Sequence, residues 1–213
     1  MNTPRVEHFF DYKSPYAWLA QLGNVMGVLP SQASKAGSAL VALGNAGAST
    51  EADIIAMSLR LAGAGKTIGL TEAQVMGFAS ALSSMGIEAE AGGSAFSRVF
   101  VDISQAVDSG GDQLDEFARV AGRSTDSFAT KFRTDAAGAV TEFVAGLGRI
   151  QASGGSVFGT LESLGLSEVR MRDALLRAAN AGDLLRDSVE LGSRAWEDNM
   201  ALVEEAGKRY ETS

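Results

Sequence analysis

The chain has 213 residues, of which 46% are hydrophobic, and a formal net charge of −8 at neutral pH. This hydrophobic content excludes disorder along the whole length, and the length is sufficient for one large domain or two small ones. The absence of cysteine excludes disulfides, thiol catalysis and zinc–thiolate sites, and the absence of any run of lysine and arginine argues against direct nucleic acid binding.

The first twenty residues form a segment of their own in the sequence. A short run of strand type, Val6 to Phe10, is followed by Ser14 and Pro15 and then by an apolar stretch of helix type. An isolated strand has no sheet to pair with, and Ser14 stands where it could cap a helix that begins at Pro15. We therefore expect residues 1–20 to be a strand-like N-terminal segment that is not a domain, and residues 21–213 to form a helical region.

After residue 20 the apolar residues recur with helical spacing, and no segment alternates as a half-buried strand would. The predicted fold class is therefore all-α, an array of eight or nine short to medium amphipathic helices joined by Gly-Ser and Gly-Asp turns. The clearest apolar stripes run from Val75 to Leu82, from Phe96 to Val107, from Val140 to Ile150 and from Met171 to Ala178, and a final helix is expected through Trp196, Met200 and Val203.

Glycine marks the expected ends of these helices. Three glycine pairs are each followed by Ser or Asp; glycine can adopt the left-handed conformation that ends a helix, and Ser or Asp can accept the free N–H groups that begin the next one. In a second pattern Gly is followed by Leu and then by Thr or Ser as the N-cap, and Thr71 with Gln74 fits a capping box. The predicted turn and cap residues are Gly69, Thr71, Gly92, Gly93, Ser94, Gly110, Gly111, Asp112, Gly154, Gly155, Ser156, Gly165 and Ser167.

Three features suggest chemistry at first inspection. The run from Gly63 to Thr67, GAGKT, resembles the end of a phosphate-binding loop, but Arg60 stands where that loop needs its first glycine, and a helix rather than a strand precedes it. The acidic clusters, such as Glu88 with Glu90, fall at helix starts or on exposed faces, where solvated carboxylates complement the helix dipole. His8 is the only histidine. We therefore expect no catalytic site, no metal and no cofactor.

Residues 49–211 carry a resemblance to a known family. The segments GIEAEAGG and LGLSEVRMRDALL, together with the helix pattern from STEADIIAMSLRL onward, resemble the core region of phage tail tape measure proteins, and residues 22–48 extend the resemblance with a weaker pattern. It implies a non-enzymatic structural protein of the virion tail, assembled in the host cytoplasm. Its implied role is in tail length determination and tail assembly.

The same resemblance implies which partners the chain has. These are phage tail-tube and tail-assembly proteins, and exposed apolar stripes add an expectation of self-association. Family members are longer than this chain, so the expected product is a fragment or a truncated gene product. Its frequent helix breaks predict a compact or stacked helical body rather than a rod.

Two alternatives remain open at this point. The opening VEHFFDYKSPYAWLA resembles the start of the DsbA-like 2-hydroxychromene-2-carboxylate isomerases and kappa-class glutathione transferases, which implies a glutathione-dependent enzyme that uses Ser14 and suggests a fusion. The late cis-proline of that fold is missing, since prolines occur only at positions 4, 15 and 30. A membrane-active helical protein is the other alternative, although the apolar stretch 16–29 is too short and too polar for a stable membrane span.

Overall fold

A computed structural model describes residues 15–27 and 30–201. It is 82% helical and has no strand among the described residues, which confirms the all-α fold class. The described helices are α1 (Pro15–Met26), a 3-10 turn η1 (Pro30–Gln32), α2 (Ala33–Ala46), α3 (Glu51–Thr67), α4 (Glu72–Ser84), α5 (Ala89–Ser109), α6 (Asp112–Ala121), α7 (Thr125–Thr134), α8 (Ala136–Ala152), α9 (Val157–Ser163), α10 (Val169–Ala179) and α11 (Gly182–Asp198).

The described part of the chain thus holds eleven α-helices where eight or nine were expected. The difference has a simple origin in short helices such as α9, which has seven residues and only three buried positions. So short a segment carries too few apolar positions to show a helical period in the sequence. Helix α1 begins at Pro15 and runs to Met26, so it crosses the expected boundary between residues 20 and 21.

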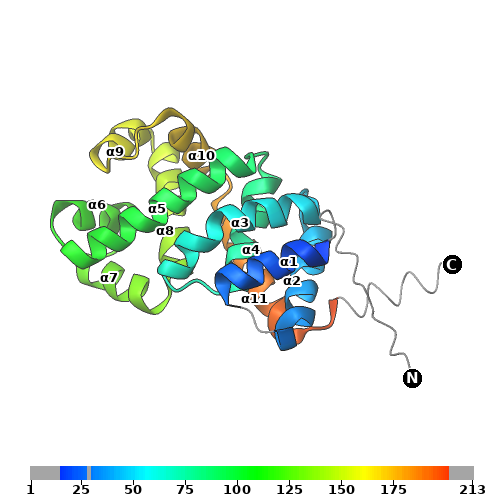
Figure 1. Ribbon diagram of the computed structural model, residues 1–213. Helices are drawn as coiled ribbons and strands as arrows, with labels where there is room; N and C mark the ends of the chain where they lie inside the picture. The colour runs from blue at the N-terminus through cyan, green and yellow to red at the C-terminus, as the bar shows by residue number, and fades with distance from the viewer. Residues whose placement is uncertain (1–14, 28–29, 202–213) are drawn as a thin grey trace, which may run out of the picture.

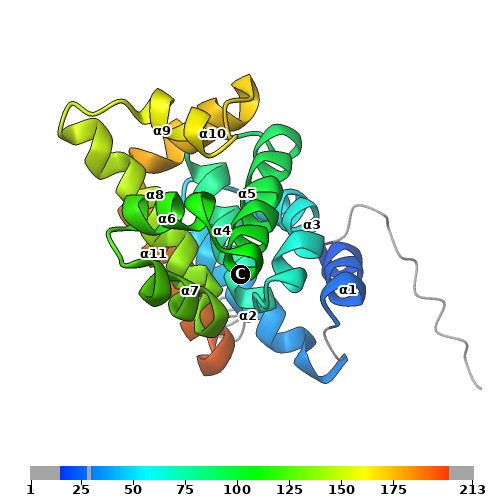
Figure 2. The ribbon, with the colours of Figure 1, turned by 90° about the vertical axis from the view of Figure 1, so that its left-hand side faces the viewer.

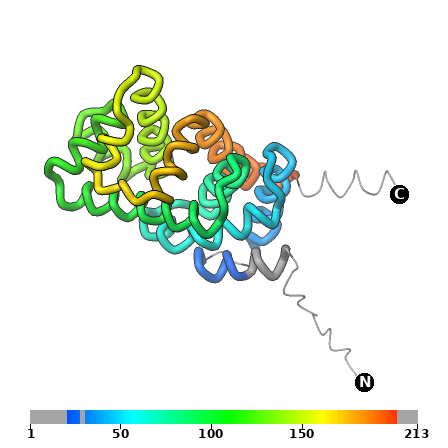
Figure 3. The backbone as a smooth tube through the Cα atoms, turned by 90° about the horizontal axis from the view of Figure 1, so that it is seen from above, coloured from blue at the N-terminus to red at the C-terminus, as the bar shows by residue number. Residues whose placement is uncertain are grey.

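Three helices organise the packing. Helix α3 contacts α1, α4 and α5, helix α8 contacts α6, α7 and α10, and helix α11 returns late in the chain to contact α2, α4 and α8. Figure 1 shows α6, α7 and α9 at one end of the molecule and α1 and α2 at the other, with α5 running between them. Figure 2 shows α1 on the outer side of α3, and the view from above in Figure 3 shows the elongated outline of the body.

The predicted apolar stripes form the core. Phe78, Phe96 and Phe100 meet edge to face between α4 and α5, with ring centroids 5.4 Å and 6.4 Å apart. Phe117 and Phe143 make a second such pair, 5.2 Å apart, between α6 and α8. These rings are fully buried and belong to one hydrophobic cluster with members from α1 to α11. Edge-to-face aromatic pairs of this kind add stability beyond the area that they bury.

The last predicted helix differs from the structure. Helix α11 ends at Asp198, because Asn199 adopts a left-handed conformation with a φ of 51° and its N–H bonds to the carbonyl of Ala195. The side chain of Asn199 accepts hydrogen bonds from Ser34 and Ser38 of α2, at 2.9 Å and 3.2 Å. The expected continuation from Trp196 through Met200 is therefore wrong, and Val203 lies outside the described residues.

Candidate functional site

Most of the predicted turn residues lie at helix ends. Thr71 is the N-cap of α4, where its hydroxyl and the side chain of Gln74 form a capping box. Ser156 is the N-cap of α9 and accepts a hydrogen bond from the N–H of Gly159 at 3.1 Å. Five predicted glycines have positive φ, in the region that favours glycine: Gly69, Gly110, Gly111, Gly154 and Gly165. Gly155 follows Gly154 and its N–H bonds to the carbonyl of Ile150, which closes the end of α8.

The pair Gly92 and Gly93, however, does not form a turn. Both residues lie inside α5, which begins at Ala89 after the N-cap Glu88, and Ser94 follows them within the same helix. Both glycines are buried, and a Cβ atom at Gly93 would collide with the Cβ of Arg60 on α3. The pair is therefore wrong as a helix end, because its lack of side chains serves the close approach of α3 and α5.

Two further capping residues are displaced by one position. Helix α10 is capped by Glu168, whose carboxylate accepts from the backbone N–H groups of Arg170 and Met171, so Ser167 precedes the cap. Helix α6 has Gly111 as its N-cap, and Asp112 is the first helical residue. The prediction that Ser167 and Asp112 are N-caps is therefore wrong. The carboxylate of Asp112 still lies in the first turn, where negative charge is favourable.

Of the residues that suggested chemistry in the sequence, the GAGKT run has a structural role, and Ser14 and His8 are not among the described residues. The GAGKT run is the end of α3, and the ammonium group of Lys66 donates to the backbone carbonyl of Val25 at 2.9 Å, which links α3 to α1. No group of His, Asp and Glu side chains able to hold a metal ion is found in the described part of the chain.

Two carboxyl groups that form ion pairs, those of Glu116 and Asp135, have lowered pKa values. The hydrogen bond from Arg119 lowers the pKa of Glu116. Burial raises the pKa of Asp135, but the hydrogen bonds that it accepts from Lys131 and from the N–H of Gly138 outweigh this effect and leave the pKa below its usual value. Since Asp135 both caps α8 and pairs with α7, its role is to fix the junction of these two helices.

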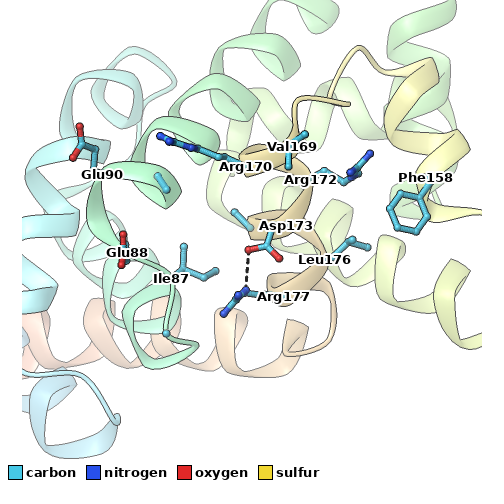
Figure 4. Close-up of a pocket in the computed structure, with 13 residues that line it drawn as sticks. Ile87, Glu88, Glu90, Phe158, Val169, Arg170, Arg172, Asp173, Leu176 and Arg177 are labelled. Atoms are coloured by element: carbon cyan, nitrogen blue, oxygen red, sulfur yellow. Dashed lines mark hydrogen bonds and ion pairs between the residues drawn. The ribbon is translucent and has the colours of Figure 1, made fainter.

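An open groove of about 820 Å³ lies between the start of α5 and helices α9 and α10. Figure 4 shows its two walls. Glu88 and Glu90 lie on the α5 wall, and Arg170, Arg172 and Arg177 lie on the α10 wall. The groove is therefore acidic on one side and basic on the other.

Two of these arginines are held by groups within the groove. The guanidinium of Arg177 pairs with Asp173 at 3.0 Å, one helical turn away. The guanidinium of Arg172 lies over the ring of Phe158 on α9, 5.1 Å from its centroid. Phe158 and Val169 also line the groove and are 56% and 67% exposed, which is unusual for large apolar side chains. Exposed apolar groups beside arginines are typical of protein–protein contact surfaces.

Sequence reasoning missed this groove. Its α5 wall was identified only as an acidic cluster, and its α10 wall was described only by the buried stripe from Met171 to Ala178. A signal was present in α10, because Val169, Arg172 and Leu176 recur at three- and four-residue spacing on a second face. The approach of α10 to α5, however, comes from the packing of helices far apart in the chain.

The described residues thus form an all-helical protein with an open groove between the start of α5 and helices α9 and α10. A protein-family model described as phage-related minor tail protein matches residues 16–159, and the chain belongs to this family. Searches of curated proteins and of solved structures give no match. The family match begins one residue after the start of α1 and ends before α10, whereas the expected tape-measure resemblance extended to residue 211.

Family membership identifies the chain as a phage tail protein, with a place in the virion tail among other tail components. Among the described residues no helix combines the length and the apolar character needed to cross a bilayer. The described residues also form no sheet, which is the element that a thioredoxin-like isomerase needs.

Proposed function

We propose that this chain is a section of a phage tail tape measure protein that takes part in tail length determination and tail assembly. Its role in this proposal is structural and non-enzymatic. The observation that carries the proposal is membership of the phage minor tail family over residues 16–159, combined with the tape-measure-like segments GIEAEAGG and LGLSEVRMRDALL. These segments lie at the start of α5 and at the start of α10, within one helical body.

Helix dimensions indicate how such a chain could set a length. Helix α5, the longest described, has 21 residues and spans about 32 Å at a rise of 1.5 Å per residue. Opened into one continuous helix, the chain of 213 residues would reach roughly 320 Å. In the structure the described helices fold back against one another. In our proposal they open out inside the tail, and the chain then contributes length in proportion to its residues.

The partners in this proposal are tail-tube and tail-assembly proteins and further copies of the chain, and assembly takes place in the host cytoplasm. The groove between α5 and α10 supports a role in binding proteins. It presents the exposed side chains of Phe158 and Val169 beside arginines. Aromatic residues and arginine are both enriched in protein interfaces.

Tail length in a phage that encodes this chain tests the proposal. An in-frame insertion of about 60 helix-forming residues at the Gly110–Gly111 turn should lengthen the tail by roughly 90 Å. An insertion of half that size is the matched control and should give half the increase. Tail lengths measured by electron microscopy that stay the same with both insertions would rule out a length-determining role and leave a minor tail protein with another structural task.

A further inference from the structure

The groove between α5 and α10 is complementary to itself. We propose that it is the contact surface of a two-fold symmetric dimer, in which the α10 wall of one copy faces the α5 wall of the other. This inference rests on the self-association included in the proposed function and identifies the surface that carries it. It does not depend on the length-determining role, so failure of either test leaves the other standing.

The distribution of charge favours a second copy as the occupant. Three carboxylates, Glu88, Glu90 and Asp173, and three arginines line the groove, which gives a balanced set although the whole chain has a net charge of −8. Among the described residues, the Arg177–Asp173 ion pair is the only one between these groups. Glu88 and Glu90 on one wall, and Arg170 and Arg172 on the other, therefore have charges available for a partner.

Symmetry decides between the partners that this groove could bind. An acidic helix laid into the groove would approach Glu88 and Glu90, and a basic one would approach the arginines, so either would meet repulsion on one wall. In a two-fold interface the same patch is used by both copies, so each contact between complementary residues occurs twice, once on either side of the symmetry axis. A second copy in this orientation places both acidic walls opposite both basic walls.

The apolar groups of the groove provide the hydrophobic part of such an interface. Phe158 projects from α9 at one end of the groove, and Val169 begins the α10 wall (Figure 4). Leu176 and Ile87 line the same groove and are less exposed. Two-fold packing would bury the exposed ring and the exposed valine of each copy, while the stacking of Arg172 on Phe158 holds the guanidinium in place before contact.

Charge reversal on the two walls tests this arrangement. One variant carries Glu88→Arg with Glu90→Arg, and the other carries Arg170→Glu with Arg172→Glu. Measured by analytical ultracentrifugation, each variant alone should dimerise at least about tenfold more weakly than the unchanged chain, because like charges then face each other. An equimolar mixture of the two should recover dimerisation, since one copy then has two basic walls and the other has two acidic walls.

Controls at exposed sites outside the groove separate this effect from a change in overall charge. Glu197→Arg near the end of α11 and Arg60→Glu on α3, both exposed, should leave dimerisation unchanged, and circular dichroism should show the same helix content for every variant. Recovery in the mixture supports the proposal. A chain that stays monomeric at high concentration overturns it, as does a dimer that neither double variant weakens, or a mixture that dimerises no better than its components.

Discussion

At the scale of single residues, two buried serines differ in what their hydroxyl groups can reach. Ser38 on α2 and Ser58 on α3 are both 0% exposed. The hydroxyl of Ser38 donates to the side chain of Asn199 at 3.2 Å, whereas the hydroxyl of Ser58 has no hydrogen-bond partner in the described structure. A buried hydroxyl without a partner reduces stability, because it has lost its hydrogen bonds to water.

This difference gives a matched pair of substitutions. Ser58→Ala should raise the free energy of unfolding by about 1 kcal/mol, because it removes an unsatisfied polar group and places a better helix former in α3. Ser38→Ala should lower it by about 1 kcal/mol, because a satisfied hydrogen bond to Asn199 is lost. Urea denaturation of the three proteins measures both changes, and equal effects of the two substitutions would contradict the assignment.

Asp135 gives a prediction about pH. Its pKa is lowered in the folded chain, so its contribution to stability is present above the unfolded value of about 3.9 and is lost as the pH falls through the folded value. Asp135→Asn keeps a side-chain oxygen to cap α8 but removes the charge that pairs with Lys131. The substituted chain should be less stable near neutral pH by a small amount, because the pair is partly exposed.

The difference in melting temperature between these two chains should shrink as the pH is lowered from about 5 to about 3. Comparing the two chains at each pH isolates Asp135, because every other carboxylate titrates in both. If the difference in melting temperature stays constant over this pH range, the ion pair between Asp135 and Lys131 is not its cause.

At the scale of helices, close crossings depend on glycine. A Cβ atom at Gly77 of α4 would lie 2.6 Å from the Cα of Val189 and 2.7 Å from the carbonyl oxygen of Ser188, both on α11. Backbone atoms cannot move aside as a flexible side chain can, so even a methyl group would force the helices apart. By contrast, a Cβ atom at Gly63 of α3 would meet nothing within 4 Å.

Gly77→Ala should therefore lower the free energy of unfolding by about 2 kcal/mol, as expected for overpacking in a rigid core. The same substitution at Gly63 is the matched control. It should raise the free energy of unfolding by up to about 1 kcal/mol, because alanine is the better helix former and has space there. Both changes are measured by thermal or urea denaturation, and a harmless Gly77→Ala would show that α4 and α11 can separate without cost.

The helix ends show how far the sequence determines the elements. Gly69 and Gly165, each followed by leucine, were predictable because a positive φ and a buried next residue both follow from local chemistry. Gly86 with Ile87 has the same pattern and ends α4, with hydrogen bonds from Gly86 to Ser83 and from Ile87 to Leu82. The nearby pair Gly92 and Gly93 was misassigned, since glycine at a crossing and glycine at a turn look alike until the neighbouring helix is known.

At the scale of the whole molecule, one hydrophobic cluster connects the two ends of the body. It runs from Leu22 on α1 to Trp196 on α11 and includes the aromatic contacts between α4 and α5 and between α6 and α8. The sequence predicted the buried stripes that form this cluster. It could not predict which stripes face each other, and for that reason the groove, whose walls come from α5 and α10, was not found.

A shared core predicts one cooperative unfolding transition. Urea unfolding followed by circular dichroism, which reports all helices, should coincide with unfolding followed by tryptophan fluorescence, to which Trp196 in α11 contributes. Two separated transitions would instead show that the α6 to α8 end unfolds independently of the end that contains α2, α4 and α11.

The return of α11 to α2 and α4 also governs the order of events during synthesis. Helices α2 and α4 leave the ribosome long before α11. Both of the close contacts between α4 and α11 need α11 in place: Gly77 of α4 packs against the backbone of α11, and Gly192 of α11 packs against the backbone carbonyl of Ala73 on α4. Until residue 198 has been made, these faces stay uncovered and open to other nascent chains. A chain shortened to the family match at residues 16–159 would remain in that state and should aggregate.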